Sequence, residues 1–103
     1  MQEVGENRKW PRSKINWPVT VKSGQITIKG ETRDISQGGV FIYCEKPITP
    51  NQLFYISIHL HSEVVTFTIM AESVWSTING IGAKFHLERS EQGQLLSEFI
   101  SEL

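Results

Sequence analysis

The chain of 103 residues is poor in the features that mark secreted, membrane-spanning and disulfide-stabilised proteins. It has one cysteine, Cys44, so no disulfide can form within the chain. No apolar run approaches the roughly 20 residues that a membrane-spanning helix needs. The polar start of the chain also lacks the basic end and apolar stretch of a signal peptide. These absences favour a reducing, cytoplasmic setting and predict no membrane insertion.

Strong net charge is lacking as well. The formal charge is −1 at pH 7, and this argues against a general DNA-binding or RNA-binding protein, because such proteins neutralise many phosphates at once. The charge is unevenly distributed, however. Residues 8–33 carry seven basic residues and one acidic residue, Glu31. A basic front on a nearly neutral protein favours a small anionic ligand over a long polyanion.

The motifs of common enzymes are absent. The chain has no phosphate-binding glycine-rich loop, and Ser36 does not lie in the G-x-S-x-G context of a serine hydrolase. His59 and His61 share one face of an expected strand, as two metal ligands would, but no third ligand sits at a matching spacing. We interpret them as exposed strand residues, and Cys44 as a small buried residue. The sequence therefore predicts no enzyme, no metal and no cofactor.

What the chain does have, after residue 17, is alternation of apolar and polar residues. This alternation predicts strands at residues 19–22, 26–29, 40–44, 53–60, 64–70, 71–78 and 81–85. Ser23-Gly24 and Asn79-Gly80 are predicted tight turns. Residues 30–39, rich in Gly, Asp and Ser, are expected to form a loop.

The apolar period becomes helical after Ser90, a residue type that favours helix N-termini. One face of this helix carries Leu95, Leu96, Phe99, Ile100 and Leu103. Six or so short antiparallel strands and a terminal helix indicate an all-β protein, a small barrel with the helix packed against it. We expect one domain at residues 17–103, preceded by a flexible polar arm at residues 1–16.

The arm carries two arginines, Arg8 and Arg12, four positions apart. The planar guanidinium group binds a phosphate through two donors, stacks on flat rings and pairs with the O6/N7 edge of guanine. Two such side chains on one arm can close over a ligand. The simpler alternative is a solvated basic tail. Trp10, between them, is a candidate either for stacking or for covering the barrel edge.

A second polar cluster is formed by residues 34–39, Asp-Ile-Ser-Gln-Gly-Gly. An ionised Asp34 accepts two parallel hydrogen bonds, which complements the N1–H and N2–H₂ donors of guanine. Ser36 can both donate and accept, and the paired glycines allow a ligand to approach the backbone closely. The alternative is an ordinary turn in which Asp34 and Ser36 satisfy their own backbone.

Together these motifs resemble the PilZ domain family. Residues 8–12 (R-K-W-P-R) are similar to its R-x-x-x-R motif, and residues 34–39 (D-I-S-Q-G-G) to its [DN]-x-S-x-x-G motif. Residues 80–85 (G-I-G-A-K-F) resemble its late strand, and residues 17–19 (W-P-V) its first strand. The motifs occur in the family's order and spacing, and the resemblance extends over about residues 7–100.

The resemblance implies a six-stranded antiparallel β-barrel with a C-terminal α-helix that binds the bacterial second messenger cyclic di-GMP. The implied arginine contacts are to phosphates and guanine Hoogsteen edges. Asp34 and Ser36 would contact a guanine, and Gly39 would leave room for the ligand. Lys9 would add a phosphate contact, and Trp75 would either stack on guanine or be a core or rim tryptophan. The implied site residues are Arg8, Lys9, Arg12, Asp34, Ser36, Gly39 and Trp75.

The predicted function is that of a cyclic di-GMP receptor. On this hypothesis the arm becomes ordered over the nucleotide, and the change is passed to a downstream protein partner. The alternative is a PilZ-like interaction adaptor that keeps the barrel and does not bind nucleotide.

Overall fold

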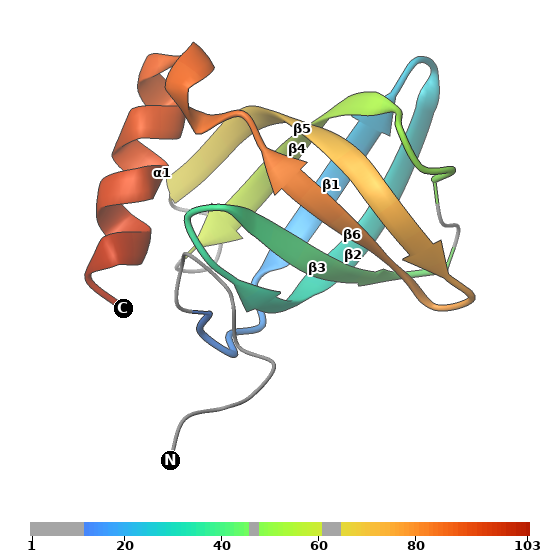
Figure 1. The fold of residues 1–103 in the computed structure, drawn as a ribbon, viewed down its shortest axis with the longest axis horizontal. Coiled ribbons are helices and arrows are strands. Elements are labelled where there is room, and N and C mark those ends of the chain that lie inside the picture. The colour runs from blue at the N-terminus through green and yellow to red at the C-terminus, as the bar shows by residue number, and fades with distance from the viewer. Residues whose placement is uncertain (1–11, 46–47, 61–64) are drawn as a thin grey trace.

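The computed structural model describes residues 12–45, 48–60 and 65–103 (Figure 1). Within these ranges the chain forms six strands, a short 3₁₀ turn η1 (Leu87–Arg89) and a helix α1 (Glu91–Ser101). The strands close into an antiparallel barrel in the order β1-β2-β3-β6-β5-β4. The prediction of a six-stranded antiparallel barrel with a C-terminal helix is thus confirmed. The strands are β1 (Pro18–Ser23), β2 (Ile26–Ile35), β3 (Gly39–Cys44), β4 (Leu53–Leu60), β5 (Val65–Thr77) and β6 (Gly80–Phe85).

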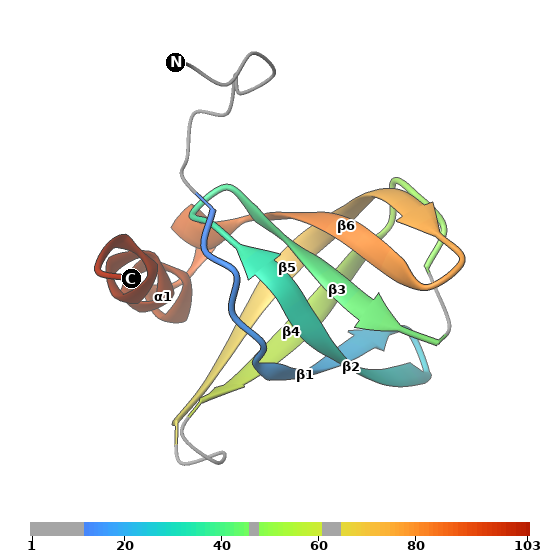
Figure 2. The ribbon, with the colours of Figure 1, turned by 90° about the horizontal axis from the view of Figure 1, so that it is seen from below.

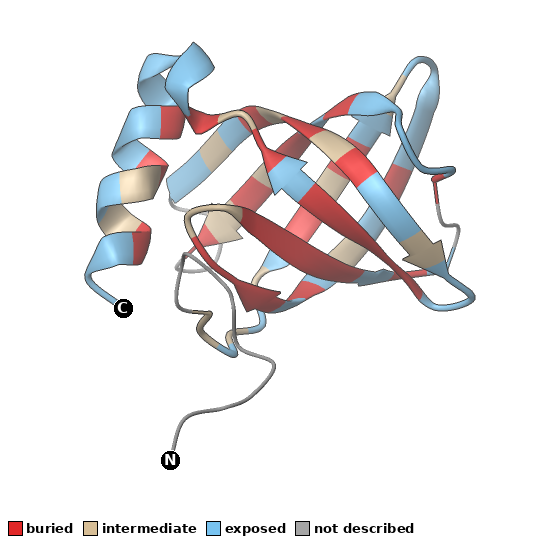
Figure 3. Cartoon of the chain, viewed as in Figure 1, coloured by how far each residue is buried: buried red, intermediate tan, exposed pale blue. Residues whose placement is uncertain are grey.

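The barrel core follows from the alternation along each strand. Inward side chains of β1 and β4, such as Val21, Ile56 and Ile58, are completely buried, while their neighbours in sequence are exposed or half-buried. Figure 3 shows how buried and exposed positions alternate along the barrel strands. Cys44, at the end of β3, is buried in the same core, as the sequence predicts. Because β1 pairs with both β2 and β4, the sheet has no free edge among these strands.

Strand β2 is longer than the sequence predicts. Residues 30–39 were expected to be a loop, but β2 continues to Ile35 and pairs with β3 from Gly30 to Ile35. Gly30 and Thr32 occupy inward positions of this extension. Because neither is a large apolar residue, the alternation of apolar and polar residues that predicts a strand is not seen there. A Cβ at Gly30 would collide with the Tyr43 carbonyl on β3, so close strand packing requires glycine there. The loop prediction was therefore wrong for residues 30–35, and Asp34 lies on a strand.

Strand β5 is also longer than expected. The two predicted segments, residues 64–70 and 71–78, belong to one strand of 13 residues that runs from Val65 to Thr77. Its first part pairs with β4 and its second part with β6, with a shift of register between Ser73 and Trp75. The two turn residues after β5 are Ile78 and Asn79. The expected turn at Asn79-Gly80 is displaced by one residue, because Gly80 is already the first residue of β6 and pairs with Thr77 of β5.

Helix α1 packs against one end of the barrel (Figure 1). Ser90 caps it as predicted, since its hydroxyl accepts a hydrogen bond from the Gly93 N–H at 3.0 Å. The buried face is narrower than the predicted one and consists of Gly93, Leu96 and Ile100, while Leu95 is exposed. Leu103 is exposed too, because the helix ends before it.

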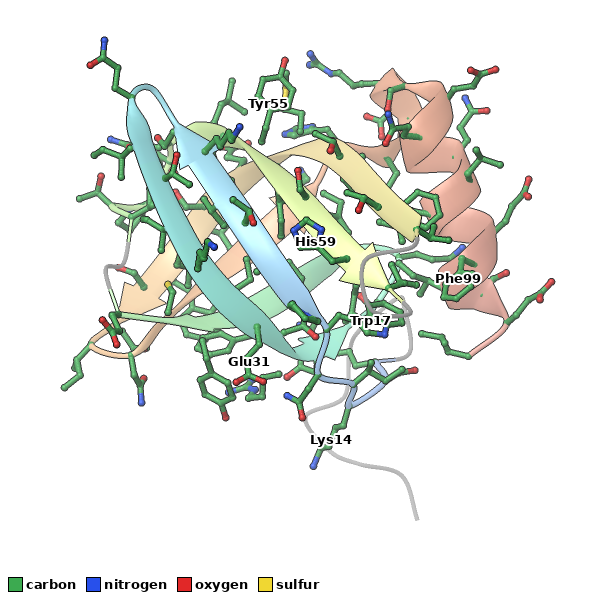
Figure 4. All side chains as sticks on the ribbon, turned by 180° about the vertical axis from the view of Figure 1, so that it is seen from behind. Lys14, Trp17, Glu31, Tyr55, His59 and Phe99 are labelled. Carbon is green, nitrogen blue, oxygen red and sulfur yellow. The ribbon has the colours of Figure 1, made fainter. Side chains whose placement is uncertain are left out.

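An aromatic cluster joins the helix to the start of the barrel. The Phe99 ring lies 5.8 Å from Trp17 and 6.3 Å from Phe67, measured between ring centroids. Figure 4 shows Trp17 and Phe99 together at this end of the molecule. Trp17, directly before β1, therefore lies against the C-terminal helix.

Residues 12–17 run beside the end of β2 before the chain enters β1 (Figure 2). Thr32, fully buried, holds this segment: its hydroxyl donates to the Ile15 carbonyl and accepts from the Trp17 N–H. The Asn16 side chain donates to the Thr32 carbonyl at 2.7 Å. The described part of the predicted arm is thus hydrogen-bonded to β2.

Candidate functional site

The charged centre of the candidate site is the Asp34 carboxylate near the end of β2. Its Oδ1 accepts hydrogen bonds from Arg12, whose Nη2 lies at 2.6 Å and Nε at 2.7 Å. Its Oδ2 accepts from the Nε of Arg33 at 2.7 Å. The side chain of Asp34 is 10% exposed. Both predicted residues Arg12 and Asp34 are therefore in direct contact, although 22 positions separate them.

Backbone pairing explains how these groups meet. Ser13 and Ile35 exchange two backbone hydrogen bonds of 2.8 and 2.9 Å, which fix the position of Arg12 beside β2. The register of β2 against β3 shifts between Thr32 and Asp34. Arg33 is the extra residue of this β-bulge, a feature that redirects side chains. The bulge thus places the side chains of two consecutive residues, Arg33 and Asp34, in contact with each other.

The two arginines also set the charge state of Asp34. Burial of the carboxyl would raise its pKa, but the hydrogen bonds and positive charges of Arg33 and Arg12 outweigh burial and lower the pKa below the ordinary value of 3.8. The carboxylate is therefore ionised at neutral pH. It accepts hydrogen bonds and donates none.

This shift predicts a pH-dependent contribution to stability. A carboxyl whose pKa is lowered by folding stabilises the fold above its ordinary pKa, and the contribution is lost as the pH falls through the lower folded value. We expect Asp34→Asn to destabilise the protein near neutral pH, and the difference from wild type to shrink as the pH falls below about 4. Urea unfolding of both proteins at several pH values measures this. A difference that does not change with pH would contradict the ion pairs described here.

Ser36 and Gly39 shape the turn between β2 and β3. The buried Ser36 hydroxyl accepts hydrogen bonds from the N–H groups of Gly38 and Gly39 at 3.1 and 3.2 Å, and the Ser36 N–H donates to the Gly39 carbonyl at 2.8 Å. A Cβ at Gly39 would collide with the Ala83 carbonyl on β6. In this structure both residues act within the turn, as the turn alternative describes for Ser36.

The same turn is connected to helix α1. The side-chain amide of Gln37 donates to the carbonyl and to the hydroxyl of Ser97, at 3.0 and 2.9 Å. Sequence reasoning missed this contact because a glutamine inside a motif gives no sign of its partner. The contact makes the position of the turn dependent on the position of the helix.

Trp75 lies on the outer surface of the barrel and is 46% exposed, so it is not a core residue. Its ring stacks on Phe41 with centroids 5.1 Å apart and covers Gly82, where a Cβ would strike the indole. On the same surface, the guanidinium of Arg33 lies 4.1 Å from the centre of the Phe41 ring. Phe41 is buried by these neighbours, although it is not part of the barrel core.

Arg33, Phe41 and Trp75 thus form a row across the outer surface, which we call the outer stack. Sequence reasoning missed Arg33 and Phe41. One signal was available: Gly80 and Gly82 lie two apart on one face of β6, and two small residues at such positions leave space for bulky side chains from neighbouring strands.

A pocket of about 490 Å³ brings four of the seven predicted site residues together. It is lined by Arg12, Ser36, Gly39 and Trp75, and also by Lys84. A larger hollow of about 870 Å³, lined in part by the start of β1 and by β2, contains none of the predicted residues. We assign the site to the smaller pocket because cationic and aromatic groups converge there. Arg8 and Lys9 lie outside the described residues.

Other sequence candidates are placed as follows. The His59 ring lies between the hydroxyls of Thr20 and Thr66, at 3.1 and 3.2 Å, on the outer face of β4 (Figure 4). His61 lies outside the described residues. In the described part of the chain, no three His, Cys, Asp or Glu side chains are grouped so that they can hold a metal ion. Among the same residues, no helix is long and apolar enough to cross a membrane.

The described chain is thus a closed barrel in which Arg12, from the segment before β1, contacts Asp34 at a pocket that also exposes Trp75. The chain belongs to the PilZ domain family, whose model matches residues 6–102. Comparison with curated protein sequences gives no significant match.

Solved structures share this fold at low sequence identity. The PilZ domain of CeSA from a cellulose-synthesizing bacterium has a TM-score of 0.75 and 19% identity, over 89% of this chain and 96% of that chain. The PilZ domain of YcgR from Escherichia coli, solved with cyclic di-GMP, has a TM-score of 0.75 and 15% identity over 95% and 92% of the two chains. The Bacillus subtilis inhibitor of motility, MotI/DgrA, has a TM-score of 0.73 and 12% identity, over 94% of this chain and 50% of that chain.

Proposed function

We propose that this PilZ domain is a cytoplasmic receptor for cyclic di-GMP and not an enzyme. The observation that carries the proposal is the contact between Arg12 and Asp34. It joins the two signature motifs at the rim of a pocket that also exposes Trp75. The YcgR domain, solved with cyclic di-GMP, has the same fold and supports the choice of ligand.

The chemistry of the pocket and of Asp34, which contacts the pocket residue Arg12, matches the parts of this ligand. The Arg12 guanidinium complements a phosphate or the O6/N7 edge of a guanine, and the ionised Asp34 complements the N1–H and N2–H₂ donors. The exposed face of Trp75 offers a surface on which a purine can stack. Arg8 and Lys9, from the same motif, would add positive charge toward the two phosphates.

These contacts are sufficient for useful affinity. Hydrogen bonds to charged groups contribute roughly 1.5–3 kcal/mol each in net terms. Each arginine and Asp34 can make two such hydrogen bonds, so the three groups together can offset the cost of ordering the arm and reach micromolar binding, about −8 kcal/mol.

We further propose that binding orders the arm and changes the surface offered to a downstream protein partner. The hydrogen bonds from Gln37 to Ser97 support the proposed change of surface, because they connect the turn of the second motif to helix α1. Amide hydrogen exchange at residues 5–14, with and without nucleotide, tests the ordering step. Equal protection in both conditions would contradict it. A domain that binds no nucleotide would instead fit the adaptor alternative.

The direct test is calorimetric titration of the purified protein with cyclic di-GMP, with cyclic di-AMP and GTP as controls. We expect binding at micromolar or lower concentration that is selective for cyclic di-GMP, and the stoichiometry gives the number of nucleotides per chain. An absence of both heat and thermal stabilisation at high nucleotide concentration would reject the receptor function and favour the adaptor.

A further inference from the structure

A role in ligand binding can also be inferred for Arg33, which belongs to neither signature motif. This inference depends on the proposed function. The edge of a guanine base presents two donors side by side, and each oxygen of a carboxylate can accept two hydrogen bonds. In this structure both oxygens of Asp34 already accept from arginines, Oδ1 from Arg12 and Oδ2 from Arg33. With 10% of its side chain exposed, Asp34 offers little surface to a third donor.

Oδ1 already receives two nitrogens of Arg12, so the two donors of a base have to be accepted by Oδ2, where Arg33 occupies one of the two acceptor sites. One arginine must therefore move before a guanine can pair with Asp34. Arg12 is held by two nitrogens on Oδ1 and by the backbone bridge of Ser13, and its side chain is 25% exposed. Arg33 contributes one hydrogen bond to Oδ2 and is 45% exposed. It lies at a β-bulge on the surface, so its side chain can turn toward solvent without disturbing the core.

Arg33 also has a second favourable contact to keep when it leaves the carboxylate. Its guanidinium lies over the Phe41 ring, whose negative face attracts a cation. Phe41 in turn stacks on Trp75, the predicted stacking residue. Release of Asp34 by Arg33 can thus occur within the outer stack, beside the pocket and without exposing the Phe41 ring.

We propose that Arg33 is an internal competitor of the guanine base. It occupies Oδ2 of Asp34, and a guanine that pairs with the carboxylate displaces it. This exchange makes the observed affinity for cyclic di-GMP lower than the intrinsic affinity of the unoccupied site. A base without the paired N–H donors cannot replace the hydrogen bond that Arg33 gives to Asp34. The exchange therefore also favours guanine over adenine.

The test is calorimetric titration of an Arg33→Met variant with cyclic di-GMP. Methionine has a long unbranched side chain that continues to cover Phe41 but has no donor for Asp34. We expect the variant to bind at least about fivefold more tightly than wild type, because one charge-assisted hydrogen bond no longer has to be exchanged. Arg33→Ala is a second variant, and melting curves establish that each variant is folded.

A matched control separates competition from loss of charge. Lys29→Met removes one positive charge from the same strand at an exposed position, and it should leave affinity unchanged or weaken it, because phosphates are attracted by positive charge. Cyclic di-AMP should gain less than cyclic di-GMP from Arg33→Met.

The outcomes distinguish this inference from the function on which it depends. If the wild-type protein binds cyclic di-GMP and both Arg33 variants bind it equally well or more weakly, the competitor role is overturned and the receptor function stands. Tighter binding by the variants, or binding by them alone, would support the competitor role. If neither wild type nor variants bind, the receptor function and the inference both fail.

Discussion

Replacement of Arg12 by alanine should weaken cyclic di-GMP binding at least about a hundredfold while the barrel stays folded. Arg12 is the described member of the R-x-x-x-R motif, and it lies at the rim of the pocket with its guanidinium on Asp34. If the proposed function is right, the variant loses a cation that would contact a phosphate or a guanine. It also loses the group that holds Oδ1 of the carboxylate in place. Both losses affect groups that are proposed to contact the ligand.

The fold should tolerate this change because Arg12 is not part of the barrel core. Asp34 keeps Arg33 as a partner, so the variant leaves no buried charge without compensation. Lys14→Ala is the matched control: it removes a positive charge from an exposed position two residues along the same segment. Calorimetry gives the affinities and circular dichroism melting gives the stabilities. Near wild-type binding by Arg12→Ala would refute its assigned role. Equal weakening by Lys14→Ala would show that Arg12 acts only through its positive charge, which attracts the anionic ligand, and not through a specific contact.

The parts of the fold that were predictable are those where burial and alternation coincide. Strand β4 was predicted with its observed bounds, Leu53–Leu60, because every second residue is apolar and buried. The second half of β2 was not, because Gly30 and Thr32 occupy inward positions that usually carry large apolar side chains. Gly30 is required by close packing on β3, and Thr32 by its hydrogen bonds to the N-terminal segment. Neither requirement is visible without the strand partner.

The site was predictable only as far as its motifs extend. Arg12, Asp34 and Trp75 were selected from the sequence, and the structure brings Arg12 to Asp34 and exposes Trp75 at the same pocket. Arg33 and Phe41 were missed because their roles depend on a β-bulge and on the register of β3 with β6. A periodic pattern carries no information about which residue a bulge redirects. Contacts between strands distant in sequence therefore had to come from the structure.

Gly93→Ala should strongly destabilise the protein, although alanine is the better helix former. In an exposed helix interior this change stabilises by about 1 kcal/mol. At position 93, however, the new Cβ would collide with the backbone of Leu87 in η1, which cannot move aside as a flexible side chain can. Gly93 is buried where the helix packs on η1, so the collision pushes α1 away from the barrel. We expect a loss of about 2–3 kcal/mol, typical of overpacked interiors.

Thermal unfolding is the measurement for this prediction. A loss of that size lowers the Tm of a domain of this length by about 10–15 °C. Gln94→Ala is the control, since it also places an alanine in the helix, at the next and exposed position, and should leave the Tm nearly unchanged. A Gly93→Ala protein as stable as wild type would show that α1 does not pack on η1 as described. If the variant stays folded with α1 displaced, the hydrogen bonds from Gln37 to Ser97 are lost with it, and cyclic di-GMP affinity then reports whether the turn depends on the helix.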